Sequence, residues 1–192
     1  RLETVGPTIS NSLKQKAIWA IALASIAIIL YIAYAFRSVP KPANSWRFGI
    51  AAVIALLHDV FTTIGIYALL SHFYGYEVSL LFITALLTVM GFSVHDTIVV
   101  FDRLRENLKR YPSKDFIVVA NDSVVQTISR SINTSLTLIL VLLTLLLLGG
   151  STITSFIVVL LVGVTIGTYS SIFTATPMLV VWQNWVDNKR DN

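Results

Sequence analysis

The feature that most constrains this chain is a carboxylate, Asp96, inside a segment that is otherwise apolar enough to span a bilayer. The surrounding residues, 91 to 103, read GFSVHDTIVVFDR. Hydrocarbon does not solvate a charge, so an ionisable side chain in a span costs about 3 kcal/mol or more unless another group compensates it. Residues of this kind mark ion paths and substrate sites in membrane proteins. We therefore predict that Asp96 belongs to a functional site.

The composition predicts an integral membrane protein. Of the 192 residues, 55% are hydrophobic and only 12% are charged, and the mean hydropathy is +0.77, which is too apolar for a soluble domain. The net charge of +4 does not indicate nucleic-acid binding, because the Lys and Arg residues lie in short segments between apolar runs. The chain has no cysteine, which excludes disulfides and thiolate metal sites.

Five apolar segments predict an all-α membrane protein with a five-span helix bundle. Each has the ~20 residues needed to cross ~30 Å of hydrocarbon, and they cover residues 17–36, 46–73, 78–102, 129–148 and 156–182. In residues 1–16 we expect the end of an extracytoplasmic domain and the start of the first span, and in 183–192 a cytoplasmic tail. The chain begins at Arg1 without a methionine, so we interpret it as a fragment of a larger protein.

The charges of the connecting segments predict the orientation. Segments 37–47, 103–114 and 189–190 hold ten Lys and Arg residues, whereas 74–77 and 149–152 hold none. Three basic residues near the N-terminus do not outweigh this bias, so the basic segments and the C-terminus should face the cytoplasm. At about 103–128 we expect a cytoplasmic loop and an interfacial helix, because Tyr111-Pro112 breaks the third span.

Arg130 is the expected partner of Asp96. Asp96 lies 18 residues from Val78 and Arg130 lies 18 residues from Leu148, so at 1.5 Å per residue each is about 27 Å from the outer end of its helix. A carboxylate and a guanidinium at one depth are natural partners in a low dielectric. Two interpretations stay open: a static ion pair that fixes helix register, and a titrating proton site, which we favour.

Asp59, His58 and His95 are further ionisable groups inside the spans. Asp59 is either a second proton-relay group or a buried carboxylate satisfied by Ser and Thr hydroxyls of other spans. His58 and Asp59 point about 100° apart on a helix, so we expect no mutual hydrogen-bonded pair. His95 adjoins Asp96 and is a lower-ranked candidate for the same site. Two histidines without a ligand spacing are weak evidence for zinc, so we expect packing roles and no metal.

Small residues in the last span predict close helix packing. Gly163 and Gly167 have the G-x-x-x-G spacing that lets another helix approach. Pro177 follows and predicts a late kink. The charged residues 102 to 106 lie at the end of span three, where we expect a solvated, salt-bridged helix extension.

These segments together resemble SecF, the smaller half of the SecDF protein-export motor, in the resistance-nodulation-division (RND) superfamily. The match rests on Val5-Gly-Pro7, Leu56-Leu-His-Asp59, the run 91–107, Ser129-Arg-Ser-Ile-Asn-Thr-Ser135 and Gly167-Thr-Tyr-Ser-Ser-Ile-Phe173. The family more often has Tyr and Asn where this chain has Phe92 and His95, and Thr where it has Ser131. The resemblance implies the C-terminal part of a six-helix RND-type transporter half.

The resemblance also implies a function and partners. Asp96 and Arg130 would serve proton transport, with Asp59 and His95 as lower-ranked members, in a subunit that uses the proton motive force for a late stage of protein export. The expected partners are a SecD-like subunit, a SecYEG-type translocon, YajC- or YidC-like proteins, preproteins and the bilayer of the inner membrane. We expect no enzymatic activity and no cofactor other than the proton gradient.

Two other functions remain in view. An RND-type exporter of small molecules or lipids would share the proton site but would need a substrate path in an outer domain. A passive scaffold subunit would use its buried charges only to hold helices together.

Overall fold

The computed structural model describes residues 7–37, 44–76 and 78–189, and within these ranges it contains helices and no strand. The elements are α1 (Pro7–Ala35), α2 (Ser45–Tyr74), α3 (Leu80–Arg110), α4 (Phe116–Leu148), the 3-10 turn η1 (Ser151–Ile153), α5 (Thr154–Ser170), the π-helical segment η2 (Ser171–Ala175) and α6 (Thr176–Asn188). Five of the described segments are long and apolar enough to cross a membrane, since residues 151 to 186 form one span. The predicted all-α, five-span bundle is confirmed.

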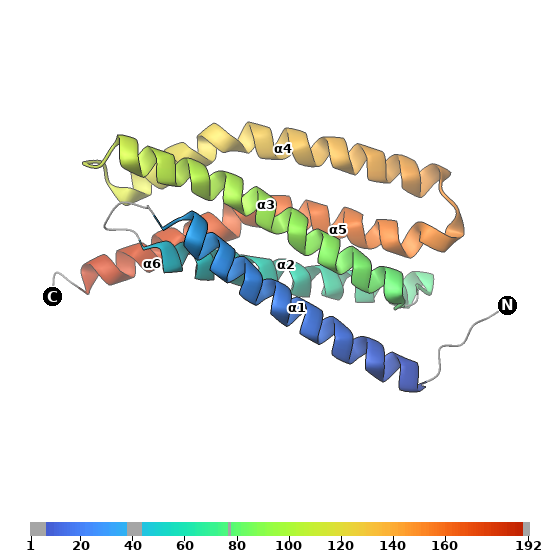
Figure 1. The fold of residues 1–192 in the computed structure, drawn as a ribbon. Helices are drawn as coiled ribbons and strands as arrows, with labels where there is room; N and C mark the ends of the chain where they lie inside the picture. The colour runs from blue at the N-terminus through green and yellow to red at the C-terminus, as the bar shows by residue number, and fades with distance from the viewer. Residues whose placement is uncertain (1–6, 38–43, 77, 190–192) are drawn as a thin grey trace.

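The helices form a bundle in which neighbouring spans run in opposite directions (Figure 1). The last residues of α1, the first residues of α2 and the α3–α4 turn lie at the end of the bundle where α6 finishes, and the last residues of α2, the first of α3 and the α4–α5 turn lie at the other end. Inside the bundle, α3 packs against α1, α2, α4 and α5, while α5 packs against α2, α3 and α4. The segments with most of the basic residues therefore share one end, as the charge pattern predicted.

Local capping sets where the spans begin and end. Asn44 caps α2 by accepting a hydrogen bond from the Trp46 backbone N–H at 3.1 Å. Gly75 ends α2 with φ of 71°, a left-handed conformation that glycine adopts without a steric cost. Asp115 caps α4 by accepting from the Ile117 N–H at 3.2 Å. Helix hairpins thus form where the sequence supplies a capping side chain or a glycine.

The connection between α3 and α4 is shorter than expected. Instead of a loop and a separate interfacial helix at about 103–128, α3 continues to Arg110 and α4 runs unbroken from Phe116 to Leu148. The hydroxyls of Ser123 and Thr127 donate to the carbonyls of Val119 and Ser123 one turn earlier, so these polar residues fit within a continuous helix.

Two apolar clusters fill the interior, and the buried polar residues lie beside them. Near the basic end, Phe36, Phe48 and Phe101 pack together, with ring centroids 5.2 to 6.4 Å apart. Toward the other end, a second cluster contains Tyr67, Phe82 and several residues of α5. Asp59 on α2 and Asp96 on α3 lie among members of the first cluster, and Ser170 and Ser171 fall between Val164 of the second cluster and Ala175 of the first.

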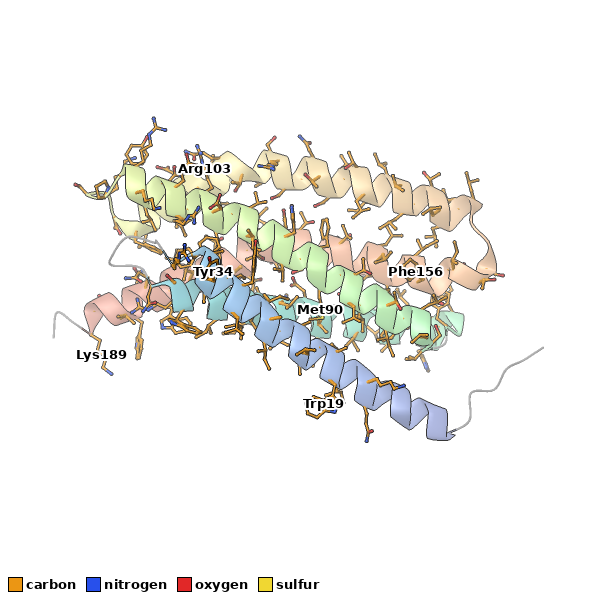
Figure 2. The ribbon with its side chains drawn as sticks, viewed as in Figure 1. Trp19, Tyr34, Met90, Arg103, Phe156 and Lys189 are labelled. Carbon is orange, nitrogen blue, oxygen red and sulfur yellow. The ribbon has the colours of Figure 1, made fainter. Side chains whose placement is uncertain are left out.

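The outer surface carries large apolar side chains, as expected for helices that face lipid. Trp19 projects away from the bundle on α1 (Figure 2) and is 75% exposed. The described side chains of α1 are buried only near its C-terminal end, at Ile32. The α1 helix therefore joins the bundle at the basic end and diverges from it toward the N-terminus (Figure 1).

The predicted glycine pair lies in the contact between α3 and α5. A Cβ atom on Gly163 would overlap both γ-methyl groups of Val89, and one on Gly167 would lie 3.1 Å from Ser93 Cβ. Val89 and Ser93 are one turn apart on α3, so the two glycines form a surface without side chains on which α3 packs. This close approach brings α5 hydroxyls next to α3.

We expect Gly163→Ala to destabilise the bundle, because the added methyl group must displace Val89 or separate the helices. Overpacking of this kind costs about 1–3 kcal/mol. Gly91→Ala is the matched control on α3, since a Cβ there meets nothing within 4 Å. Thermal unfolding in detergent should show a lower midpoint for Gly163→Ala only, and equal midpoints for the two variants would contradict the packing described here.

Candidate functional site

Asp96 is buried in the middle of α3 and receives one hydrogen bond. Its side chain accepts from Ser171 Oγ at 2.8 Å, and the residue is 5% exposed. Among the described residues Ser171 is its single donor, whereas an ionised carboxylate can accept about four hydrogen bonds. Asp96 is therefore a buried carboxylate with unused acceptor capacity.

Arg130 does not pair with Asp96 in this structure, contrary to our expectation. No ion pair within the described ranges includes Arg130, whose residue is exposed on α4. The next residue, Ser131, is 1% exposed and marks the side of α4 that faces the bundle. Because successive residues are about 100° apart around a helix, equal depth did not place the guanidinium on the side toward α3.

Asp59 on α2 is fully buried and has three hydrogen-bond donors. Ser93 of α3 donates to its carboxylate, Ser170 of α5 donates at 2.6 Å, and His58 Nδ1 lies 3.0 Å from Oδ1. The contacts match the interpretation of Asp59 as a buried carboxylate satisfied by hydroxyls of other spans. They also join three helices, α2, α3 and α5, at one point.

The expectation that His58 and Asp59 would not bond to each other is wrong. The Cβ atoms of adjacent residues do diverge by about 100°, but the imidazole is long enough to bend back to the carboxylate. The His58 side chain is 42% exposed, while that of Asp59 is 0% exposed. The pair therefore connects a buried charge to the outside of the bundle.

His95 lies on the exposed side of α3, facing away from Asp96. No hydrogen bond joins the two residues among those the structure describes, and His95 is exposed while Asp96 is buried. Within the same ranges no three His, Cys, Asp or Glu side chains are close enough to hold a metal ion.

The sequence motifs contained the serines of this site, but their role was not recognised. Ser170 and Ser171 are both fully buried at the end of α5 and the start of η2. Consecutive residues of one helix thus contact two carboxylates on two other helices. The signal in the sequence was a pair of adjacent serines in an apolar span, three and four residues after Gly167, which permits close packing.

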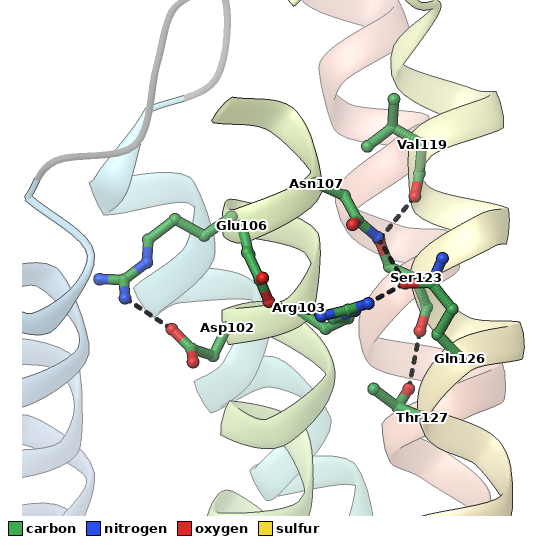
Figure 3. Close-up of polar contacts among 9 residues, drawn as sticks. Asp102, Arg103, Glu106, Asn107, Val119, Ser123, Gln126 and Thr127 are labelled. Carbon is green, nitrogen blue, oxygen red and sulfur yellow. Dashed lines mark hydrogen bonds and ion pairs between the residues drawn. The ribbon is translucent and has the colours of Figure 1, made fainter. Parts of the chain in front are cut away.

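A second polar cluster ties α3 to α4 at the basic end (Figure 3). Asn107 Nδ2 donates to Ser123 Oγ at 2.9 Å and to Gln126 Oε1 at 3.0 Å, and Arg103 Nε donates to Gln126 Oε1 at 2.6 Å. The salt-bridged helix extension expected here includes an ion pair between Arg105 and Asp102 with an N–O distance of 2.7 Å. This end of α4 is fixed to α3, whereas much of α4 beyond Arg130 is exposed.

We expect Asp59→Ala to lower the free energy of unfolding by about 3 kcal/mol, because buried hydroxyl donors lose their acceptor. Asp102→Ala is a suitable control, since its side chain is 58% exposed in an ion pair at the helix end and its loss should cost about 1 kcal/mol or less. Thermal unfolding of both variants in detergent measures the difference. Similar losses for the two aspartates would contradict the role assigned to Asp59.

The chain is similar over nearly its whole length to known proteins. The family described as protein export membrane protein SecD/SecF, C-terminal, matches residues 1–185. The protein translocase subunit SecF of Thermobaculum terrenum is 52% identical over 181 residues, which are 94% of this chain and 56% of that protein. The protein translocase subunit SecDF of Thermus thermophilus is 42% identical over 95% of this chain and 23% of that protein.

A solved structure has the same fold. The crystal structure of SecDF in its super-membrane-facing form aligns with a TM-score of 0.82 and 37% identity, over 97% of this chain and 23% of that one. The chain therefore spans a little over half of the SecF relative and about a quarter of the SecDF chains. Together with the five apolar helical segments, these similarities identify a multi-pass membrane protein.

Proposed function

Because the chain belongs to the SecD/SecF C-terminal family of protein export membrane proteins, we propose that it is the membrane part of a SecF-like subunit of the Sec machinery. The subunit would use the proton motive force to assist a late stage of protein export. It would do so without enzymatic chemistry, by coupling proton movement to a change in the helix bundle.

The observation that carries this proposal is the environment of Asp96. The side chain lies in a membrane-spanning helix, is nearly buried, and has one hydroxyl donor and no paired cation among the described residues. Ionisable side chains inside membrane spans mark proton and ion paths, so a buried carboxylate with unused acceptor capacity at this position supports a proton-carrying role. Asp96 would bind and release the transported proton.

Arg130 would act on Asp96 electrostatically in a different arrangement of the bundle. In the present arrangement the guanidinium is on the exposed side of α4. A shift of α4 that brought it toward α3 would favour the ionised form of Asp96 and thus proton release. Asp59 has three donors, against one for Asp96, so we place it below Asp96 as a relay group, together with the exposed His95.

Exposed polar residues in the spans support a partner bundle. Thr84, Thr88 and His95 line one side of α3, and Arg130 and Asn133 lie on the exposed side of α4. The ionisable and amide groups among them are unfavourable against lipid, whereas the hydroxyls of Thr84 and Thr88 donate to carbonyls of their own helix. We propose that they face a SecD-like half, which the SecDF relatives carry in the same chain according to their name. A SecYEG-type translocon, YajC- or YidC-like proteins and preproteins complete the proposed assembly.

Two rival functions share some of these features. An RND-type exporter would use the same carboxylate, but the family and the relatives are named for protein export, which favours translocation. A passive scaffold would need Asp96 only as a hydrogen-bond acceptor for Ser171. Replacement of Asp96 distinguishes the scaffold from the motor.

We expect Asp96→Asn to abolish proton-gradient-driven export while the complex still assembles. Asn keeps an oxygen that can accept from Ser171, but it cannot bind and release a proton. Secretion of a reporter in cells depleted of the native subunit measures export, and copurification with the SecD-like half checks assembly. Normal export by an assembled Asp96→Asn complex would favour the scaffold.

The proposed location is the inner membrane, with the C-terminus and the basic end of the bundle in the cytoplasm. A single cysteine at Ser113, in the turn between α3 and α4, should resist a membrane-impermeant maleimide added to intact cells. The matched cysteine at Ser151, exposed at the opposite end of the bundle, should be labelled. The reverse labelling pattern would overturn the orientation.

A further inference from the structure

We propose that Ser170 and Ser171 are positioning residues for the two buried carboxylates, with Ser170 holding Asp59 and Ser171 reversing its hydrogen bond when Asp96 binds a proton. This inference rests on the proposed function, since it assumes that Asp96 is protonated during the cycle. It assigns a role to two hydroxyls whose consecutive positions link α2, α3 and α5.

The geometry gives each serine its own carboxylate. Ser170 Oγ lies 2.6 Å from Asp59 Oδ2, and Ser171 Oγ lies 2.8 Å from Asp96 Oδ2. Both serines are fully buried, so no solvent competes for their hydroxyl protons. Gly167, which lets α3 approach α5, is on the preceding turn and has Ser93, another donor to Asp59, beside it.

Ser171 has two acceptors within reach but only one proton to donate. Its Oγ lies 2.8 Å from Asp96 Oδ2 and 3.0 Å from the carbonyl oxygen of Thr168. An ionised Asp96 can only accept, so Ser171 donates to it. A protonated Asp96 can donate from its own hydroxyl to Ser171 Oγ, and the Ser171 proton then turns to Thr168. One proton is added to Asp96 and none leaves the serine, so the exchange is balanced.

The reversal acts on the backbone where α5 changes into a π-helix. Thr168 is in the last turn of α5, and η2 begins at Ser171. The wider turn is followed by Pro177, which has no N–H, and Thr176 Oγ1 donates to the Ser171 carbonyl at 3.2 Å. When the Ser171 hydroxyl donates to the Thr168 carbonyl, that carbonyl gains a hydrogen bond at the junction of α5 and η2. The neighbouring Ser170 keeps its hydrogen bond to Asp59.

Other ionisable groups surround this junction, and none of them bonds to Asp96 in the described part of the chain. They are His58 and Asp59 on α2, His95 on α3, Arg130 on α4 and Tyr169 on α5. His58 bonds to Asp59, and the other three are exposed. The hydrogen bond from Ser171 is therefore the direct contact through which a change in the protonation of Asp96 acts on the α5–η2 junction.

The test is the protonation of Asp96 in the full-length protein, reconstituted in liposomes with its SecD-like half. A hydrophobic carbodiimide modifies protonated carboxyls in the membrane, and mass spectrometry of peptides identifies the modified residue. In the wild type, labelling of Asp96 should fall as the pH rises. Ser171→Ala should increase labelling at neutral pH about fivefold, because a hydroxyl stabilises a charged carboxylate more than a neutral one.

Conservative variants and a matched control separate this role from a structural one. Ser171→Thr should restore wild-type labelling and export, and Ser171→Cys, with a weak donor of similar size, should lie between Ala and wild type. Thr165→Ala removes another α5 hydroxyl, one that donates to the Leu161 carbonyl in its own helix, and should change neither readout. If Ser171→Ala does not assemble, the Cys variant provides the comparison.

The outcomes distinguish this inference from the proposed function. If wild-type Asp96 labelling does not change with pH, the proton-carrying role of Asp96 is wrong. If it does change but Ser171→Ala and Ser171→Cys follow the wild-type curve, Ser171 does not position the carboxylate and this inference is overturned. Increased labelling of Asp96 in Ser171→Ala, with wild-type labelling in Ser171→Thr, supports the role assigned to Ser171.

Discussion

The architecture depends on the hydrogen bonds that stabilise two carboxylates inside a membrane-spanning bundle. Water is absent from hydrocarbon, so each charge needs donors from neighbouring helices. Asp59 has three such donors and Asp96 has one. Hydroxyl donors from two other helices hold Asp59 in place, whereas Asp96 has unused acceptor capacity. The same chemical group is therefore held in two different hydrogen-bond environments.

Close packing of α3 against α5 makes these hydrogen bonds possible. A serine hydroxyl is short and reaches a carboxylate on another helix only where the backbones approach closely. Gly163 and Gly167 provide that approach by removing the side chains that would meet Val89 and Ser93. Apolar residues such as Leu56, Val60 and Val94 lie next to the carboxylates along the same helices. Helix packing and hydrogen bonding are therefore coupled, because the two glycines set the separation of α3 and α5 across which the serines reach the carboxylates.

Much of this arrangement was predictable from the sequence, and the failures have a common cause. The five spans followed from apolar length, and the depth of Asp96 followed from helix rise. Rotation about the helix axis did not follow, so Arg130 was paired with a residue that it does not face. The bend of the His58 ring toward Asp59 was missed because only Cβ directions were considered. The sequence analysis placed a separate helix at the membrane interface because the start of α4 is polar. The Ser123 and Thr127 hydroxyls instead donate to carbonyls one turn earlier, so α4 is continuous.

The length of the α3–α4 hairpin has a mechanical consequence. The helices contain 31 and 33 residues, so at 1.5 Å per residue each is about 46–50 Å long, against a hydrocarbon layer of ~30 Å. Their ends at Leu80 and Leu148 are apolar, and the excess length lies at the basic end, where Asn107 and Gln126 join the two helices. The hairpin thus extends about 16–20 Å beyond the hydrocarbon at the basic end. A tilt of α3 in the middle of the membrane would therefore displace the tip of the hairpin at the aqueous boundary.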